Sequence, residues 1–487
     1  MLEPAYQADV VVVGAGVAGL SAAHRLTSAG VTTAVLEAAH CVGGRMSTEK
    51  VDGFRLDRIG QLLSTAYPEL GLTPGLDALV LRPFTPGVLL HSDGRHHRAG
   101  AQAGAGSARG ALHAVRALAN APRPGALPRP RAAAARTGAP PGGRAVPLPG
   151  SRPGGPWQSV PPPRVRPGAP LGTAVDQARL GAALTRLAAT PAERLLRRPE
   201  AAAAEALAAR GLPARTIDGF LRPLLAALLC DPDLTTSSRC ADLALRAFAA
   251  GRLCVPEGGA EVLPELLART LPPGVVHTGV HVTSVSTTSV ATAEHGEFRC
   301  RAVLVATDAR AAAELLPGLR VPVFHPVTVV HHTTDEPPAT GGSLLLDADR
   351  GGPVAHTTVT SAVDPSRAPE GRALISSTVL GTPPDGVDTA VRMHLARLYG
   401  TSTARWETLA VHHTAEAVPA MRPPHDLRRA VRLLAGLYVC GDHRDTSTVQ
   451  GALHSAHRAA AAILSDLGAG GSMHRADPVR GAAAEAA

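Results

Sequence analysis

The stretch VVVVGAGVAG, residues 10–19, decides the fold of this 487-residue chain. Its run of valines is typical of a short, fully buried parallel strand, which we predict over residues 9–13. Gly14, Gly16 and Gly19 follow with the spacing G-x-G-x-x-G. The first glycine permits a tight turn, the second lets the backbone approach a pyrophosphate, and the third lets a helix pack against the strand. Residues 20–29 have helical character, so the stretch predicts the start of a nucleotide-binding βαβ unit.

The second strand of this unit is predicted over residues 33–36 and ends at Glu37, eighteen residues after Gly19. A carboxylate at this place can accept both hydroxyl protons of a ribose, and it repels a 2′-phosphate. Val17 and Ala18 lie where the helix begins, so unpaired N–H groups and the positive end of the helix dipole face the phosphates. Ala38 is assigned to the same site. The motif alone leaves NAD and FAD open as ligands.

Further blocks along the chain decide between these ligands. They are Gly43-Gly44-Arg45, Gly60-Gln61, the P-E-G-G turn at 256–259, V-L-V-A-T at 303–307, and L-Y-V-C-G-D at 437–442 followed by Gln450-Gly451-Ala452. In this order they resemble the superfamily of flavin amine oxidases, phytoene desaturases and protoporphyrinogen oxidases. One departure is Ala456, where the family usually has glycine. The resemblance implies FAD as the cofactor and an α/β fold: a discontinuous Rossmann-type FAD/NAD(P)-binding domain with an inserted α+β substrate domain.

The resemblance also assigns each block a part of the cofactor. Arg45 supplies positive charge beside the phosphates, and the backbone at Val282 contacts the adenine. Asp442 binds a ribitol hydroxyl, and the N–H groups of Gly451 and Ala452 face the electron-rich edge of the flavin. The complete set of predicted cofactor-binding residues is Gly14, Gly16, Val17, Ala18, Gly19, Glu37, Ala38, Gly43, Gly44, Arg45, Gly60, Gln61, Val282, Ala306, Thr307, Gly441, Asp442, Gln450, Gly451 and Ala452.

The domains are predicted to interleave along the chain. The FAD-binding domain takes 8–70, 251–315 and 430–467, the substrate domain takes 71–250 and 316–429, and a flexible tail follows at 468–487. Within the substrate domain, residues 94–173 are rich in Pro, Arg, Ala and Gly without any period, which is typical of a linker or disorder. We read Gly104-Ala105-Gly106 as part of this low-complexity sequence and not as a second nucleotide site.

The charge distribution argues against a nucleic-acid partner. The chain carries a net charge of +8, but twelve arginines and no acidic residue lie between Gly94 and Val175, so the rest is net acidic. No cysteine pair or histidine pair has metal-ligand spacing, so no metal is predicted. We see no signal peptide and no apolar run long enough to span a membrane. A cytoplasmic protein is expected, with peripheral membrane contact left open.

The only lysine, Lys50, bears on the reaction. Many amine oxidases of this family place a lysine near the flavin, in the region before the last FAD strand, and this chain has none there. We therefore expect an FAD-dependent oxidoreductase that removes a hydride from a C–H bond of an apolar or polycyclic small molecule. One alternative is an amine or amino-acid oxidase that works without lysine, and another is an FAD-binding protein without catalytic activity.

Catalytic residues, electron acceptor and oligomeric state are not predicted. Residues 413–421 are expected to form the substrate wall that faces the flavin. Residues 221–229 are either an apolar pocket lining or ordinary helix core. His443, directly after Asp442, is expected to be an exposed loop histidine.

Overall fold

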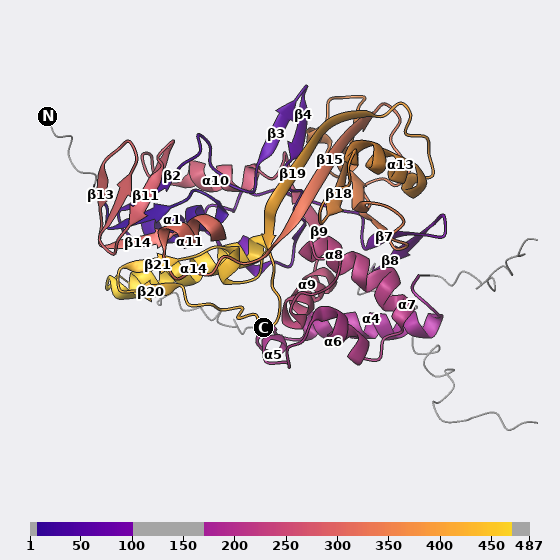
Figure 1. Ribbon diagram of the computed structural model, residues 1–487, viewed down its shortest axis with the longest axis horizontal. Coiled ribbons are helices and arrows are strands. Elements are labelled where there is room, and N and C mark those ends of the chain that lie inside the picture. The colour runs from indigo at the N-terminus through magenta and orange to yellow at the C-terminus, as the bar shows by residue number, and fades with distance from the viewer. Residues whose placement is uncertain (1–6, 101–169, 470–487) are drawn as a thin grey trace, which may run out of the picture.

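The computed structural model describes residues 7–100 and 170–469 (Figure 1). A six-stranded sheet lies on the left of Figure 1, the longer strands of a seven-stranded sheet at the upper right, and a group of helices at the lower right. The six-stranded sheet has the order β10 (Val276–Thr278), β2 (Thr33–Glu37), β1 (Val10–Val13), β14 (Ala302–Val305), β21 (Leu437–Val439), β20 (Arg432–Leu434). All neighbours are parallel except β20 and β21.

The predicted strand at residues 9–13 is confirmed as β1, and both of its faces are buried. Val10 and Val12 pack in one hydrophobic cluster with helices α1 (Val17–Ser28), α10 (Val262–Thr270) and α14 (Val449–Asp466). Val11 and Val13 pack in another, with α11 (Ala309–Leu315) and the small sheet β11-β12-β13 (Val282–Val285, Ser289–Thr292, Glu297–Arg299). Because side chains alternate along a strand, four consecutive valines satisfy both layers.

The central place of β1 fixes where a ligand can bind. Its neighbours are β2 on one side and β14 on the other, and all three run in the same direction. Their carboxyl ends therefore lie at one edge of the sheet. Open parallel sheets bind ligands at this edge, where the chain turns to opposite sides.

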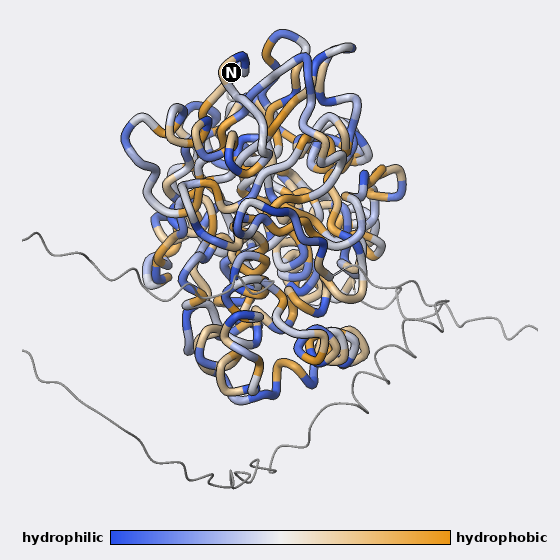
Figure 2. The backbone as a smooth tube through the Cα atoms, turned by 90° about the vertical axis from the view of Figure 1, so that its right-hand side faces the viewer, coloured by the Kyte–Doolittle hydropathy of each residue, from blue (hydrophilic) through white to orange (hydrophobic). Residues whose placement is uncertain are grey.

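The seven-stranded sheet has the order β19-β15-β18-β17-β16-β7-β8. Its strands are β7 (Val88–Ser92), β8 (Arg95–Ala99), β15 (Phe324–Thr334), β16 (Leu345–Asp347), β17 (Val354–Val359), β18 (Ala373–Leu380) and β19 (Glu407–Pro419). One face carries α13 (Val387–Tyr399), which packs on Leu89 and Leu345. The other face, with Val88, Leu90 and Leu346, packs on the helical group. Figure 2, turned by 90° from Figure 1, shows short hydrophobic and hydrophilic stretches alternating along the backbone.

The helical group follows the gap in the described residues. It comprises α4 (Ala174–Ala189), α5 (Ala192–Leu196), α6 (Ala203–Ala209), α7 (Ala214–Thr216), the π-helix η1 (Ile217–Leu221), α8 (Arg222–Leu229) and α9 (Ser238–Ala250). The remaining elements are the hairpin β3-β4 (Thr48–Val51, Phe54–Asp57), the sheet β5-β9-β6 (Leu63–Ser64, Leu253–Pro256, Leu81–Pro83), helices α2 (Pro68–Leu72) and α12 (Thr360–Val363), and the 3-10 turns η2 (Pro365–Arg367) and η3 (Asp442–Arg444). None of the described helices is long and apolar enough to cross a membrane.

The strands differ from the sequence-based expectation. Residues 95–99, placed in the low-complexity segment, form β8 and pair with β7. In the seven-stranded sheet β16 pairs with β7 in parallel, whereas the other neighbouring strands pair antiparallel. The thirteen-residue strand β19 was missed because its polar residues alternate at a half-exposed edge. Residues 101–169, with Gly104 and Gly106, lie outside the described residues.

Candidate active site

A cavity of about 650 Å³ opens at the carboxyl edge of the six-stranded sheet. Its volume is within the range of roughly 300–1,000 Å³ that ligand pockets occupy. Most of the predicted cofactor residues line it: Gly14, Gly16, Val17, Ala18, Glu37, Ala38, Gly43, Gly44, Arg45, Gln61, Val282, Ala306, Thr307, Gly441, Asp442 and Ala452. We call it the cofactor cavity. Sequence reasoning missed other lining residues, among them His281, Thr283, Asp308 and Thr448, which no motif marks.

The glycines of the first motif separate a packing requirement from a ligand requirement. A Cβ at Gly19 would lie 2.0 Å from the carbonyl oxygen of Gly14, so packing alone demands glycine there. A Cβ at Gly16 would meet no protein atom within 4 Å, and its φ of −74° is open to any residue. Gly16 nevertheless lines the cofactor cavity. The space beside it therefore fits a ligand that approaches the backbone closely, as a pyrophosphate does.

Helices α1 and α14 both begin at this cavity, and they differ in their N-caps. No side chain caps α1, whose N-cap is Gly16, so its first N–H groups are free to bind an anion. Thr448 caps α14, since its Oγ1 accepts the Gly451 N–H at 3.1 Å. The Ala452 N–H donates to the Thr448 carbonyl oxygen at 2.9 Å. Both N–H groups therefore already have an acceptor within the chain, and their predicted contact with the flavin stays a prediction.

Two backbone N–H groups hold the Glu37 carboxylate at the wall of the cavity. Its Oε2 accepts the Ala15 N–H at 2.7 Å, and its Oε1 accepts the Ala39 N–H at 2.9 Å. Each carboxylate oxygen keeps a lone pair for a ligand hydroxyl. This geometry suits the ribose role, which stays a prediction.

Arg45 and Asp442 lie 397 residues apart in sequence and form an ion pair in the cavity wall. The Arg45 Nη2 donates to Asp442 Oδ1 at 2.6 Å, and its Nη1 donates to the Ala417 carbonyl oxygen at 2.9 Å. The arginine thus ties the segment after β2 to the turn after β21 and to β19. Its predicted charge beside the phosphates is already balanced in part by Asp442.

His443 differs from the sequence-based expectation in its burial. It is not an exposed loop histidine, because only 6% of its surface is accessible. Burial lowers its pKa to about 4, so the ring is neutral at neutral pH. Neither ring nitrogen has a hydrogen-bond partner among the described residues. A Cβ at Gly441, which has φ of +138°, would lie 2.7 Å from this ring, so the ring and the glycine fit each other.

Four predicted residues do not line the cofactor cavity. Gly19 packs against the Gly14 turn, and Gly451 packs against Thr446. Gly60 and Gln450 line two smaller neighbouring cavities instead. Their assignment as cofactor contacts stays a prediction.

A second cavity of about 280 Å³ adjoins the first, and Thr448 lines both. Much of its wall is apolar: Leu196, Leu228, Leu229, Leu243, Ala244, Ala247, Phe248, Leu253, Met421 and Leu427. Residues 221–229 were expected to be either an apolar pocket lining or helix core, and they are both. Leu221, Leu224 and Leu225 lie in the core, and the end of α8 lines this cavity. Segment 413–421 supplies Ala417 and Val418 to the first cavity and Met421 to the second.

Carboxylates in the second cavity have cationic or imidazole partners. Glu69 lies 3.4 Å from both Arg25 and His457. Asp445 accepts from His454 Nδ1 at 2.9 Å and lies 3.5 Å from Arg458.

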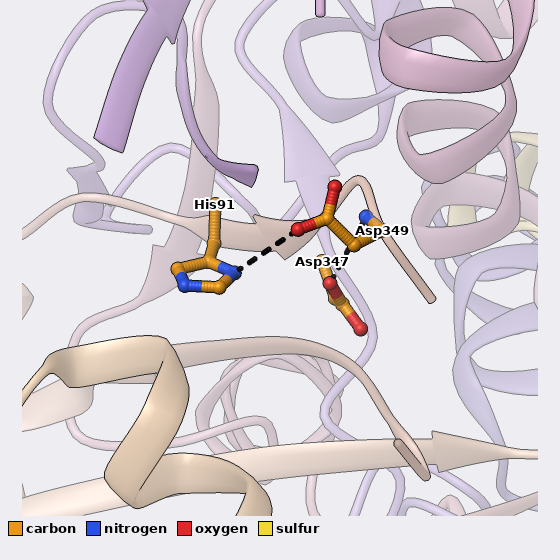
Figure 3. Close-up of side chains that lie close together, drawn as sticks. All are labelled: His91, Asp347 and Asp349. Atoms are coloured by element: carbon orange, nitrogen blue, oxygen red, sulfur yellow. Dashed lines mark hydrogen bonds and ion pairs between the residues drawn. The ribbon is translucent and has the colours of Figure 1, made fainter. Parts of the chain in front are cut away.

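Figure 3 shows one cluster of possible metal ligands, which lies outside both cavities. His91 Nδ1 points toward Asp349 Oδ2 at 3.9 Å, and Asp347 lies beside them. Ser92 and the backbone of Asp93 donate to Asp349, and His394 lies 3.1 Å from Asp347. These contacts give both carboxylates hydrogen-bond or ion-pair partners within the protein.

Comparison with known proteins agrees with this geometry. The family of flavin-containing amine oxidoreductases matches residues 17–464. The chain is 46% identical over 98 residues to putrescine oxidase from Kocuria rosea, and 53% identical over 49 residues to carotenoid 3,4-desaturase from Haloarcula japonica. These stretches cover 20% and 10% of this chain and the same shares of the two relatives.

A solved structure extends the likeness to the whole fold. The structure of an oxidoreductase from Methanosarcina mazei matches with a TM-score of 0.64 at 14% identity, covering 92% of this chain and 99% of that one. The family match identifies the cofactor, and the glycine-lined cavity and the uncapped α1 terminus fit its pyrophosphate. The chain belongs to the flavin-containing amine oxidoreductase family, an oxidoreductase family whose cofactor is FAD.

Proposed function

We propose that this protein oxidises an apolar small molecule at a C–H bond, and that the second cavity holds the substrate. The observation that carries the proposal is the shared wall at Thr448, where a largely apolar cavity meets the cofactor cavity. When bound, FAD accepts the hydride of such a bond. The chain's own part is to orient the apolar substrate and to exclude water from it.

The charges support an apolar substrate over an amine. Lys50 lies on β3 with its Nζ 3.0 Å from Glu261, and it lines neither cavity. An ammonium group entering the second cavity would have to compete with Arg25 and Arg458 for Glu69 and Asp445. An apolar ligand would not have to displace any ion pair, because its burial against the apolar wall is favourable by itself.

An amine or amino-acid oxidase is the second candidate. The similarity to putrescine oxidase favours it, and so do the carboxylates that line the second cavity. The similarity to the carotenoid desaturase favours the first candidate. The two candidates differ in the compound that reduces the flavin.

The test is anaerobic bleaching of the flavin absorbance in the purified protein. We expect cyclic or polyene hydrocarbons to bleach the flavin and putrescine or amino acids to leave it unchanged. Bleaching by amines with release of peroxide in air would overturn the proposal in favour of the second candidate. A flavin that no compound in either class bleaches would identify an FAD-binding protein without this activity.

A further inference from the structure

A third cavity, of about 500 Å³, is lined by cations and lies apart from both cavities described above. Its charged side chains are Arg320, Arg422, Arg429 and Arg444, and His425 lies among them. No carboxylate lines it. We call it the arginine hollow.

The arginines come from three separate parts of the chain. Arg320 lies between α11 and β15, Arg422 and Arg429 follow β19, and Arg444 ends the turn η3. Among the described residues, none of the four forms an ion pair with a carboxylate. This contrasts with Arg45 and Arg458, which do. Asp426 is close enough to influence Arg444 but does not line the hollow.

Arg444 is the clearest sign that the hollow is built for a ligand. Only 9% of the Arg444 surface is exposed, and its buried Nε has no hydrogen-bond partner among the described residues. Burial, followed by the charges of Arg429 and Arg458, lowers its pKa. A buried guanidinium surrounded by like charges is costly unless an anion balances it.

Backbone contacts hold two of these guanidinium groups in place. Arg444 donates to the Ala430 carbonyl oxygen, and Arg429 Nη1 donates to the His443 carbonyl oxygen at 3.5 Å. Arg458 in turn donates to the Arg444 carbonyl oxygen at 3.0 Å. The groups are therefore partly oriented before any ligand arrives, which lowers the cost of binding.

We propose that the arginine hollow binds a small molecule carrying two or more oxyanion charges, of the phosphate or polycarboxylate class. Guanidinium groups recognise both chemistries with paired N–H donors. Several unpaired cations in one hollow favour a polyanion over a single charge. The hollow lies on the other side of segment 420–429 from the second cavity, because Met421 and Leu427 face that cavity and Arg422 and Arg429 face the hollow. The site goes beyond the proposed reaction.

The test is isothermal titration calorimetry on the FAD-loaded protein at constant ionic strength. Inorganic pyrophosphate, inorganic phosphate and citrate serve as separate probes. Arg320→Gln and Arg422→Gln change exposed side chains, so the fold should survive, and flavin absorbance checks this. We expect each variant to weaken binding about tenfold or more, since each removes one charge-assisted contact. Arg269→Gln, on the exposed side of α10, is the matched control.

Tighter binding of pyrophosphate than of citrate would assign the phosphate class, and the reverse order would assign the polycarboxylate class. Heat release by none of the three probes would overturn the proposal. Equal binding by Arg422→Gln and Arg269→Gln would overturn it as well, because the anion would then respond to general charge alone. Neither outcome affects the bleaching experiment, so failure here is distinguishable from failure of the proposed function.

Discussion

The cofactor cavity and the second cavity share Thr448 but are built in opposite ways. The cofactor cavity lies at the carboxyl ends of β1, β2, β14 and β21, and Gly14, Gly16, Gly43, Gly44 and Gly441 are among its lining residues. The second cavity is lined by residues of α5, α8 and α9 and by the segments around Tyr67, Met421 and Thr448. The difference teaches that a glycine-lined site at strand ends depends on local spacing, whereas a site between helices depends on packing.

The largest expected effect separates packing from ligand binding within one motif. Gly19→Ala places a Cβ 2.0 Å from the Gly14 carbonyl oxygen, so it should destabilise the fold by about 4 kcal/mol or more. Urea unfolding measures the free energy. Gly181→Ala, on the exposed side of α4 with no atom near the new Cβ, is the control and should not destabilise. A Gly19→Ala variant as stable as this control would break the packing argument.

The pH dependence of stability compares a buried histidine near the cofactor cavity with two buried histidines in the seven-stranded sheet. Burial lowers the pKa of His443, near the cofactor cavity, to about 4, that of His356 to about 4, and that of His331 to about 3. Below the ordinary histidine pKa of about 6.5 the unfolded chain binds more protons, so stability is full above that pH and falls as the pH drops toward 4. Each histidine should lower the free energy of unfolding by about 3 kcal/mol as the pH falls from 6.5 to 4.

Urea unfolding between pH 8 and pH 4 checks this dependence. The loss should begin near pH 6.5, and His443→Asn should flatten part of the curve. A free energy of unfolding that stays constant from pH 8 to pH 4 would contradict the assignment of these rings as buried and neutral.

A smaller effect is expected at Gly16, where the fold tolerates a side chain but the ligand should not. Gly16→Ala should leave the stability of the cofactor-free protein unchanged, because no protein atom lies within 4 Å of the new Cβ. The dissociation constant for FAD should rise about 100-fold, or about 2.7 kcal/mol. Flavin absorbance and fluorescence titration measure it. Full flavin content in this variant would place the pyrophosphate elsewhere.

The smallest effect concerns the second cavity. Ala244 lines it, and Ala244→Leu reduces its volume. The KM of whichever compound bleaches the flavin should rise about tenfold, or about 1.4 kcal/mol, with FAD binding unchanged. Ala182→Leu, on the exposed side of α4, is the control. Equal KM values in both variants would show that the substrate lies outside this cavity.

Much of the cofactor cavity was predictable because its determinants are close in sequence. The interval from Gly14 to Glu37 contains the turn, the helix start and the Glu37 carboxylate, and the structure brings all of them to one edge. The later blocks at 303–307 and 437–442 were found by resemblance; β14 of the first pairs with β1, and β21 of the second pairs with β14.

Other features could not be read from the residues alone. Asp442 and His443 are adjacent, yet one pairs with Arg45 in the cavity wall and the other is buried without a partner among the described residues. The Gly451 N–H donates to the Thr448 side chain and the Ala452 N–H donates to the Thr448 carbonyl oxygen, so both donors already have an acceptor within the chain. A threonine at this position can cap a helix, and it then competes with a ligand for the same N–H group.

The sequence by itself determined the βαβ unit and most of the cofactor cavity, because backbone turns and glycine spacing act over a few residues. The tertiary structure alone decided the Arg45–Asp442 pair, the second cavity and the arginine hollow. Each of these joins segments that are far apart in the chain. Their geometry depends on how the sheets and helices pack, and no local pattern of residues records that packing.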